Sequence, residues 1–130
     1  MQFSQIKETC LYVSDLEEAQ QFYGEVLGLP LIHASEGRHV FFRAGSSVLL
    51  IFHPAATQAE ETLPPHYAAG KQHLAFECRP GEYQAWKDRL QAAGVAITHE
   101  QSWGGGRESF YFEDPAGHVL EVVQPGIWGD

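Results

Sequence analysis

The two halves of the chain repeat the same order of segments, and this repeat restricts the possible folds more than any other feature. In each half a strand-like run leads through a turn into an amphipathic stretch that ends at a glycine. Aligning the halves places Glu8 over His73, a shift of 65 residues, and Gly28 over Gly94, a shift of 66 residues. Such a repeat indicates one supersecondary unit that occurs twice. Each half is therefore predicted to contain a strand, a helix, and then two or three antiparallel strands.

The amphipathic stretches have the periodicity of helices. Apolar side chains recur three or four positions apart, which places them on one face of a helix. Ser14 or Asp15 can cap the first helix, and Glu17 or Glu18 follows three residues later, as in a capping box. The predicted apolar faces are Leu16, Ala19, Phe22, Tyr23, Val26 and Leu27 in the first helix, and Tyr83, Trp86, Leu90 and Ala93 in the second.

A segment rich in alanine, proline and threonine separates the halves. It is expected to run over the surface or across the mouth of a cavity. The weakest strand patterns are Leu31–Ser35 and Val95–His99, and each is predicted to form one strand. The predicted organisation is a single domain over residues 1–130, with a first module at about 1–57, a linker at about 54–70 and a second module at about 71–125.

Composition and charge narrow the possible partners. The 130 residues include 44% apolar residues, enough for a domain with a core. With 17 Asp and Glu against 8 Lys and Arg, the formal charge of −9 disfavours nucleic acids and anionic membranes, because both attract clustered Lys and Arg. The two cysteines, Cys10 and Cys78, are too few for a disulfide framework. The chain start lacks a signal-peptide pattern and no apolar run could span a bilayer, so a soluble cytoplasmic protein is expected.

Alternation along three predicted strands places polar side chains on the face away from the helices. Side chains in a strand point alternately to its two faces. By this pattern Glu8, His73 and Glu121 lie opposite the apolar side chains that pack under each helix. A glutamate inside an apolar strand is costly without a partner, a metal ion or water. The three strands are therefore predicted to line one concave polar cavity.

Three stretches resemble the vicinal oxygen chelate superfamily of glyoxalases, bleomycin-resistance proteins and extradiol dioxygenases. They are LYVSDLEEAQQFYGEVLGL near the start, HLAFE after the midpoint, and SFYFEDPAGHVLEVV near the end. The resemblance implies an α+β fold in which two repeated βαβββ modules form a cupped mixed sheet around a metal site. It also implies a small-molecule substrate and a homodimer.

The resemblance further implies up to four metal-ligand positions, at Glu8, Leu50, His73 and Glu121. His73 and Glu121 have the residue types that members of the superfamily carry there. The first position is usually histidine and here is Glu8, whereas the second often carries a carboxylate and here is Leu50. A site of two carboxylates and one imidazole suits a divalent Mn, Fe, Ni, Zn or Mg ion. Its open positions would take two vicinal oxygens of a substrate, whose negative charge the ion stabilises.

Structural alternatives stand beside these ligand assignments. Glu8 could form an ion pair with Arg43 or Lys7 at the sheet surface. Glu121 could bond to backbone or to an arginine. The remaining histidines are mostly interpreted as structural or surface residues.

Further side chains are assigned to the substrate site. Tyr111 lies ten residues before Glu121, and fosfomycin-resistance thiol transferases of the superfamily carry a substrate-contacting tyrosine at that spacing. Tyr111 is therefore assigned with Glu121 to catalysis, and the alternative is a packing aromatic. Arg107 follows three glycines in a predicted turn or lid, where it could neutralise an anionic substrate or simply be solvated. The predicted substrate-binding residues are Tyr111, Arg107, Trp103, Leu50 and Phe52.

Three functions remain open at the level of sequence. The favoured hypothesis is a metal-dependent lyase, isomerase, thiol transferase or dioxygenase acting on a small oxygenated molecule. The alternative is a metal-free protein that sequesters a drug-like ligand, and the third is a non-catalytic dimeric accessory domain. Glyoxalase I activity is disfavoured because Leu50 removes a carboxylate that could serve as ligand and base. Extradiol cleavage is disfavoured because it usually needs two histidines and one glutamate.

Overall fold

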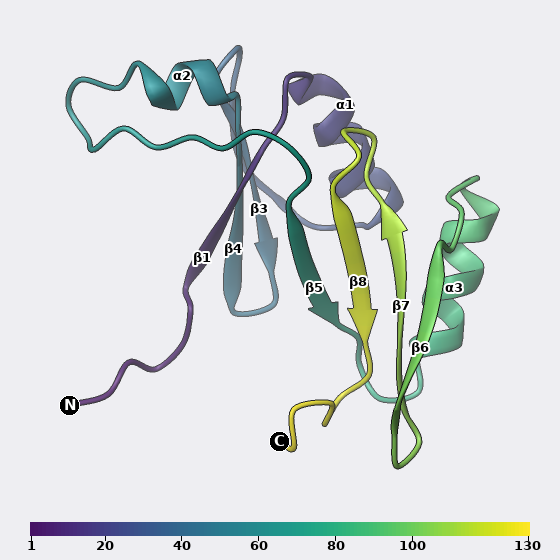
Figure 1. Ribbon diagram of the computed structural model, residues 1–130. Coiled ribbons are helices and arrows are strands. Elements are labelled where there is room, and N and C mark those ends of the chain that lie inside the picture. Colours follow the sequence, from purple (N-terminus) through teal and green to yellow (C-terminus); the bar gives the residue numbers. More distant parts are fainter. The chain divides into compact units, whose positions relative to one another are not determined.

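The chain folds into two compact units, Met1–Gly70 and Lys71–Asp130. The computed structural model describes residues 1–130. Each unit contains one four-stranded mixed sheet and its own helices (Figure 1). Both units follow the order strand, helix, three strands, so the predicted α+β fold with two repeated βαβββ modules is confirmed.

The sheet of the first unit has the strand order β1-β4-β3-β2. Strand β1 (Glu8–Tyr12) pairs in parallel with β4 (Ser47–Phe52). Strand β3 (His39–Ala44) runs antiparallel between β4 and β2 (Leu31–Ser35). The strand predicted at Leu31–Ser35 is therefore confirmed.

The helix of the first unit begins as an α-helix, α1 (Leu16–Gln21), and continues as a π-helical segment, η1 (Phe22–Val26). Asp15 caps its N-terminus, because the Asp15 side chain accepts a hydrogen bond from the backbone N–H of Glu18 at 3.0 Å. Of the two caps that the sequence allowed, the structure uses Asp15.

The π-helical turn was not predicted. The N–H of Leu27 donates to the carbonyl of Phe22, five residues earlier, at 3.0 Å. Phe22, Tyr23 and Leu27 are all 7% exposed or less, so the predicted apolar face is buried although the turn is wider than an α-helix. Apolar periodicity does not separate the two kinds of turn, because both bring these three side chains to the sheet.

The sheet of the second unit has the equivalent order, β5-β8-β7-β6. Strand β5 (His73–Glu77) pairs in parallel with β8 (Val119–Val123). Strand β7 (Arg107–Glu113) runs antiparallel between β8 and β6 (His99–Gly104).

Helix α3 (Tyr83–Ala92) covers one face of this second sheet (Figure 1). Leu90 on α3 is completely buried, and the ring of Tyr83 meets the ring of Phe110 edge-on at 5.3 Å. Phe110, Phe112 and Leu120 are also completely buried. The opposite face therefore carries the alternate side chains, which include the predicted polar ones.

The strand predicted at Val95–His99 is wrong in its bounds, because β6 starts only at His99. Val95 still belongs to the end of α3, since its N–H donates to the carbonyl of Leu90 at 2.9 Å. This bond and the positive φ of Gly94 (79°) form a Schellman motif, which closes the helix before the chain can join the sheet.

The segment predicted as a linker contains a short helix, α2 (Pro54–Gln58). His53 caps it by accepting a hydrogen bond from the N–H of Ala55 at 3.2 Å, and Pro54 occupies the first helical turn, where proline is tolerated. None of the helices is long and apolar enough to cross a membrane.

Candidate functional site

A histidine and a glutamate meet on the face of the second sheet that α3 does not cover. His73 begins β5, Glu121 lies in the middle of β8, and Nε2 of His73 is 3.4 Å from Oε1 of Glu121. Glu121 is 6% exposed, so its carboxylate needs a compensating partner. The structure thus brings together two of the three predicted metal ligands.

The second ring nitrogen of His73 determines how this imidazole can be used. Nδ1 lies 2.8 Å from the carbonyl oxygen of Val119, which can only accept a hydrogen bond. In the neutral ring Nδ1 therefore carries the hydrogen, and Nε2 directs a lone pair at Glu121. A lone pair and a carboxylate oxygen repel each other at this distance unless a proton or a cation lies between them. The pair is therefore arranged either as an imidazolium–carboxylate ion pair or as two ligands of a cation.

The chemistry of this pair fits a divalent metal ion. Metal-binding histidines commonly donate their other ring N–H to a backbone carbonyl, as His73 does to Val119. An imidazole nitrogen and a carboxylate oxygen are suitable ligands for first-row divalent ions. Within either unit, no group of three or more His, Cys, Asp or Glu side chains is close enough to hold a metal ion. In the second unit, His73 and Glu121 are the two candidate ligands that the structure brings together.

Tyr111 lies beside this pair on β7, directly opposite Glu121. Its ring is stacked near the imidazole of His73, with centroids 6.1 Å apart and planes inclined by 26°. The carboxylate of Glu121 lies near its hydroxyl. Partial burial, followed by the negative charge of Glu121, raises the pKa of Tyr111 above its usual value. The phenol therefore keeps its proton at neutral pH and is a hydrogen-bond donor.

Two further predicted substrate residues lie in the β6–β7 hairpin. Trp103 donates a hydrogen bond from its indole N–H to the hydroxyl of Ser109 at 2.9 Å, and 52% of the Trp103 side chain is exposed. Arg107 donates from Nη1 to the carbonyl of Gly126 at 3.2 Å and from Nε to that of Gly104 at 3.4 Å. In this structure Arg107 ties the hairpin to the C-terminal segment. The predicted glycine turn is confirmed as the connection between β6 and β7.

The other predicted site residues belong to the first unit. Glu8 is exposed at the start of β1 and shares a face of the first sheet with Leu50 and Phe52 of β4. Leu50 is half-buried and Phe52 is 6% exposed. This is the face that α1 does not cover, as the alternation predicted. None of the ion pairs found in the structure involves Glu8.

An aromatic and imidazole cluster lies on the same face of the first sheet and was not predicted. The ring of His39 stacks on Phe41, with centroids 3.9 Å apart, and its Nε2 is 2.9 Å from Nδ1 of His33. Burial, followed by the neighbouring His33, lowers the pKa of His39. Tyr12 is hydrogen-bonded to His66 next to this cluster. The alternation of His39 and Phe41 with buried Val40 and Phe42 would have revealed this face.

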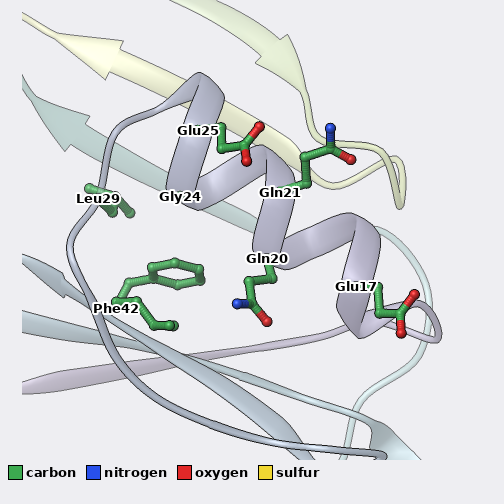
Figure 2. Close-up of a pocket in the computed structure, with 8 residues that line it drawn as sticks. Glu17, Gln20, Gln21, Gly24, Glu25, Leu29 and Phe42 are labelled. Carbon is green, nitrogen blue, oxygen red and sulfur yellow. The ribbon is translucent and has the colours of Figure 1, made fainter.

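A hollow of about 510 Å³ opens on the other side of the first sheet (Figure 2). Most of its lining comes from α1 and η1, with the buried ring of Phe42 at its base. None of the predicted site residues lines it. Its lining residues are Glu17, Gln20, Gln21, Gly24, Glu25, Leu29, Leu31 and Phe42.

The sequence pattern of the Glyoxalase/Bleomycin resistance protein/Dioxygenase superfamily matches residues 5–122. The chain belongs to this superfamily. The match extends over both units and includes Glu8, His73, Tyr111 and Glu121, so the resemblance seen in the sequence is confirmed.

Similar members of the superfamily include proteins whose names refer to glutathione. A glutathione transferase FosA of Serratia marcescens is 33% identical, over 86% of this chain and 74% of the relative. A probable lactoylglutathione lyase of Vibrio parahaemolyticus is 26% identical, over 95% of this chain and 93% of the relative. The crystal structure of a lactoylglutathione lyase from Agrobacterium tumefaciens has a TM-score of 0.93 and 36% identity, covering 98% of each chain.

Proposed function

We propose that this protein is a metal-dependent enzyme that binds a small oxygenated substrate through two vicinal oxygens, with His73 and Glu121 as metal ligands. The observation that carries the proposal is the orientation of His73. Its Nδ1–H donates to Val119, so the Nε2 lone pair faces a carboxylate that is 6% exposed. A divalent ion bound there would supply Lewis acidity toward the substrate oxygens.

Glu8 is the proposed third ligand. It stands at the position where the superfamily usually has its first histidine, and it lies on the face of its own sheet that α1 does not cover. A glutamate in place of a histidine makes the ligand set richer in oxygen, which favours Mn, Fe or Mg relative to Zn. Leu50 stands at the remaining ligand position and cannot bind a metal ion.

Tyr111 is proposed to contact the substrate. Its pKa is raised above the usual value of 10.0, so the hydroxyl is protonated at neutral pH, and Tyr111 pairs with Glu121 across the neighbouring strands. From there the hydroxyl can donate a hydrogen bond to a substrate oxygen that gains negative charge. Trp103 is proposed to form an apolar wall of the same site, because its N–H is already bonded to Ser109 and its ring is half exposed.

The names of the relatives narrow the substrates to be screened. They refer to glutathione or to a thiol: glutathione transferase, lactoylglutathione lyase and metallothiol transferase. Thiol adducts and thiol transfer to oxygenated acceptors are therefore the first reactions to assay. Leu50 still argues against lactoylglutathione cleavage itself.

Metal content by plasma mass spectrometry tests the proposal on protein purified without a histidine tag or chelator. We expect close to one ion per chain in the wild type and almost none in His73→Asn or Glu121→Gln, because each variant removes one ligand. Glu77→Gln removes an exposed carboxylate from the same strand as His73, and His33→Asn disrupts the contact between His33 and His39. Both control variants are expected to keep the ion.

The metal-free alternative has one specific observation in its favour. The first sheet presents half-buried aromatic rings, among them Tyr12 and Phe41, that suit a planar apolar ligand. If the wild type takes up no metal after incubation with Mn²⁺, Fe²⁺, Ni²⁺ and Zn²⁺, the enzyme proposal fails. A thermal-shift screen of aromatic ligands would then test the sequestering function.

A further inference from the structure

His73 stands at the very beginning of β5, where strand ends normally fray. Three bonds of the preceding residues hold this strand end. Lys71 forms an ion pair with Glu113, the carbonyl of Gln72 accepts a hydrogen bond from the N–H of Val119 at 2.9 Å, and the N–H of Gln72 donates to the ring of His118 at 3.0 Å. In the last of these bonds, a side chain accepts a hydrogen bond from the backbone of the strand end.

The imidazole of His118 is buried, and hydrogen bonds hold the backbone of this residue in place. His118 is 3% exposed, and its own backbone is fixed at both ends. Its N–H donates to Oδ1 of Asp114 at 2.8 Å, and its carbonyl accepts from the N–H of Asp114 at 3.0 Å. The tight turn before it needs the positive φ of Gly117, 86°. Since a backbone N–H donates to Nδ1 of His118, that nitrogen must be the unprotonated one.

The same bonds lead directly to the proposed metal ligand. Nδ1 of His118 accepts the N–H of Gln72, and the carbonyl of Gln72 accepts the N–H of Val119. The carbonyl of Val119 in turn accepts the Nδ1–H of His73. If Gln72 moves away from His118, His73 moves with it. Nδ1 of His73 then loses Val119, the ring can rotate or change tautomer, and Nε2 no longer faces Glu121.

We infer that His118 is a positioning residue for His73: by accepting the Gln72 N–H it keeps the His73 lone pair directed at Glu121. This inference rests on the proposed function, in which His73 is a metal ligand. His118 itself touches neither the ion nor the substrate. Its contribution is to place a ligand that stands at a strand end, and the superfamily match over residues 5–122 does not assign it this role.

Two substitutions of similar size separate the acceptor from the bulk of the ring. In His118→Asn the side-chain Oδ1 takes the place of Nδ1 and can accept the Gln72 N–H, whereas His118→Leu has the same branching and no acceptor. Both lose the outer part of the ring, so their packing defects are comparable. We expect Ni²⁺ and Mn²⁺ affinity, measured by calorimetry, to stay close to wild type in the asparagine variant. In the leucine variant it should fall about 10- to 100-fold, the usual effect of losing a residue that orients a metal ligand.

Nitrogen-15 NMR of the histidine rings provides a readout that does not depend on metal. In the metal-free wild type and in His118→Asn, Nδ1 of His73 should carry a hydrogen that is bonded to Val119 and exchanges slowly, whether or not Nε2 is protonated. In His118→Leu this slowly exchanging hydrogen should be lost. The amide of Gln72 should exchange faster only in the leucine variant. If His118→Leu does not fold, His118→Phe, which keeps a ring without an acceptor, is measured in its place.

The outcomes separate the two ideas. Wild-type protein that binds no metal, together with loss of the slowly exchanging Nδ1–H of His73 in His118→Leu, defeats the proposed function and leaves the positioning of His73 established. Metal binding and a slowly exchanging Nδ1–H of His73 in His118→Leu overturn the inference while the proposed function stands. Equal losses of affinity in the asparagine and leucine variants also overturn it, because ring volume would then matter and the acceptor would not.

Discussion

At the scale of single residues, the chemistry of the site depends on which polar atoms carry a hydrogen and which present a lone pair. Nδ1 of His73 donates to a carbonyl and Nδ1 of His118 accepts from a backbone N–H, so this nitrogen carries a hydrogen in His73 and none in His118. Burial and Glu121 raise the pKa of Tyr111 above its usual value of 10.0, so the phenol is a hydrogen-bond donor at neutral pH. A buried carboxylate, a lone pair and a hydroxyl donor thus converge on one spot of the second sheet.

Tyr83 provides a residue-scale prediction about pH. Burial, followed by the charges of Glu108 and Glu100, raises the pKa of Tyr83 to about 12. A pKa raised in the folded state contributes stability that is present below the unfolded value of 10.0 and is lost as the pH rises toward 12. We therefore expect the free energy of unfolding to fall less steeply between pH 10 and pH 12 in Tyr83→Phe than in the wild type. Denaturant titrations across this range measure the slope.

Tyr67→Phe is the matched control for this experiment. Tyr67 is 58% exposed, so its removal should leave the slope of stability against pH unchanged. Identical slopes for the wild type and Tyr83→Phe would show that the environment of Tyr83 does not favour the neutral phenol.

At the scale of elements, the two modules are similar in strand order but differ in their helices. The first helix widens into the π-helical segment Phe22–Val26, whereas α3 stays α-helical and closes in a Schellman motif. The first helix also has the side-chain cap Asp15, and α3 has no side-chain hydrogen bond at its cap. Local capping therefore matters more for the first module.

Substituting Asp15 tests this cap. Asp15→Ala removes the acceptor for the N–H of Glu18 and should lower the free energy of unfolding by about 1 kcal/mol. Asp15→Asn keeps an acceptor and should cost much less. Urea unfolding followed by far-ultraviolet circular dichroism is the suitable measurement, because all three tryptophans lie in the second unit. Equal losses in both variants would mean that the charge of Asp15, rather than its hydrogen bond, stabilises the helix.

At the scale of the whole molecule, ligand binding is coupled to folding. An ion that binds only the folded protein stabilises it, by about 2.7 kcal/mol when its free concentration is 100 times its Kd. We expect a bound divalent ion to raise the Tm of the wild type and EDTA to reverse the rise. His73→Asn should show no rise at the same ion concentration. A rise of equal size in His73→Asn would place the ion somewhere other than the proposed site.

Much of the fold followed from the sequence because it depends on local periodicity. The repeat, the faces of both helices and the alternation that puts Glu8, His73 and Glu121 away from the helices are all readable from spacing of apolar residues. The three superfamily stretches were sufficient to predict the fold and the family. Three local features were missed, the π-helical turn, the short helix α2 and the start of β6, because apolar spacing does not report which carbonyl each N–H bonds to.

The sequence alone thus determined the modules, their faces and the residues that could bind a metal ion, since these depend on neighbours within a few positions. The tertiary structure decided which of those residues meet and in what protonation pattern. His73 meets Glu121 and Val119 only because β5 and β8, 46 residues apart at His73 and Val119, pair in parallel. His118 likewise acquires its partner Gln72 from the other end of the second unit. Such long-range hydrogen bonds leave no periodic trace in the chain, and they set the direction of the His73 lone pair.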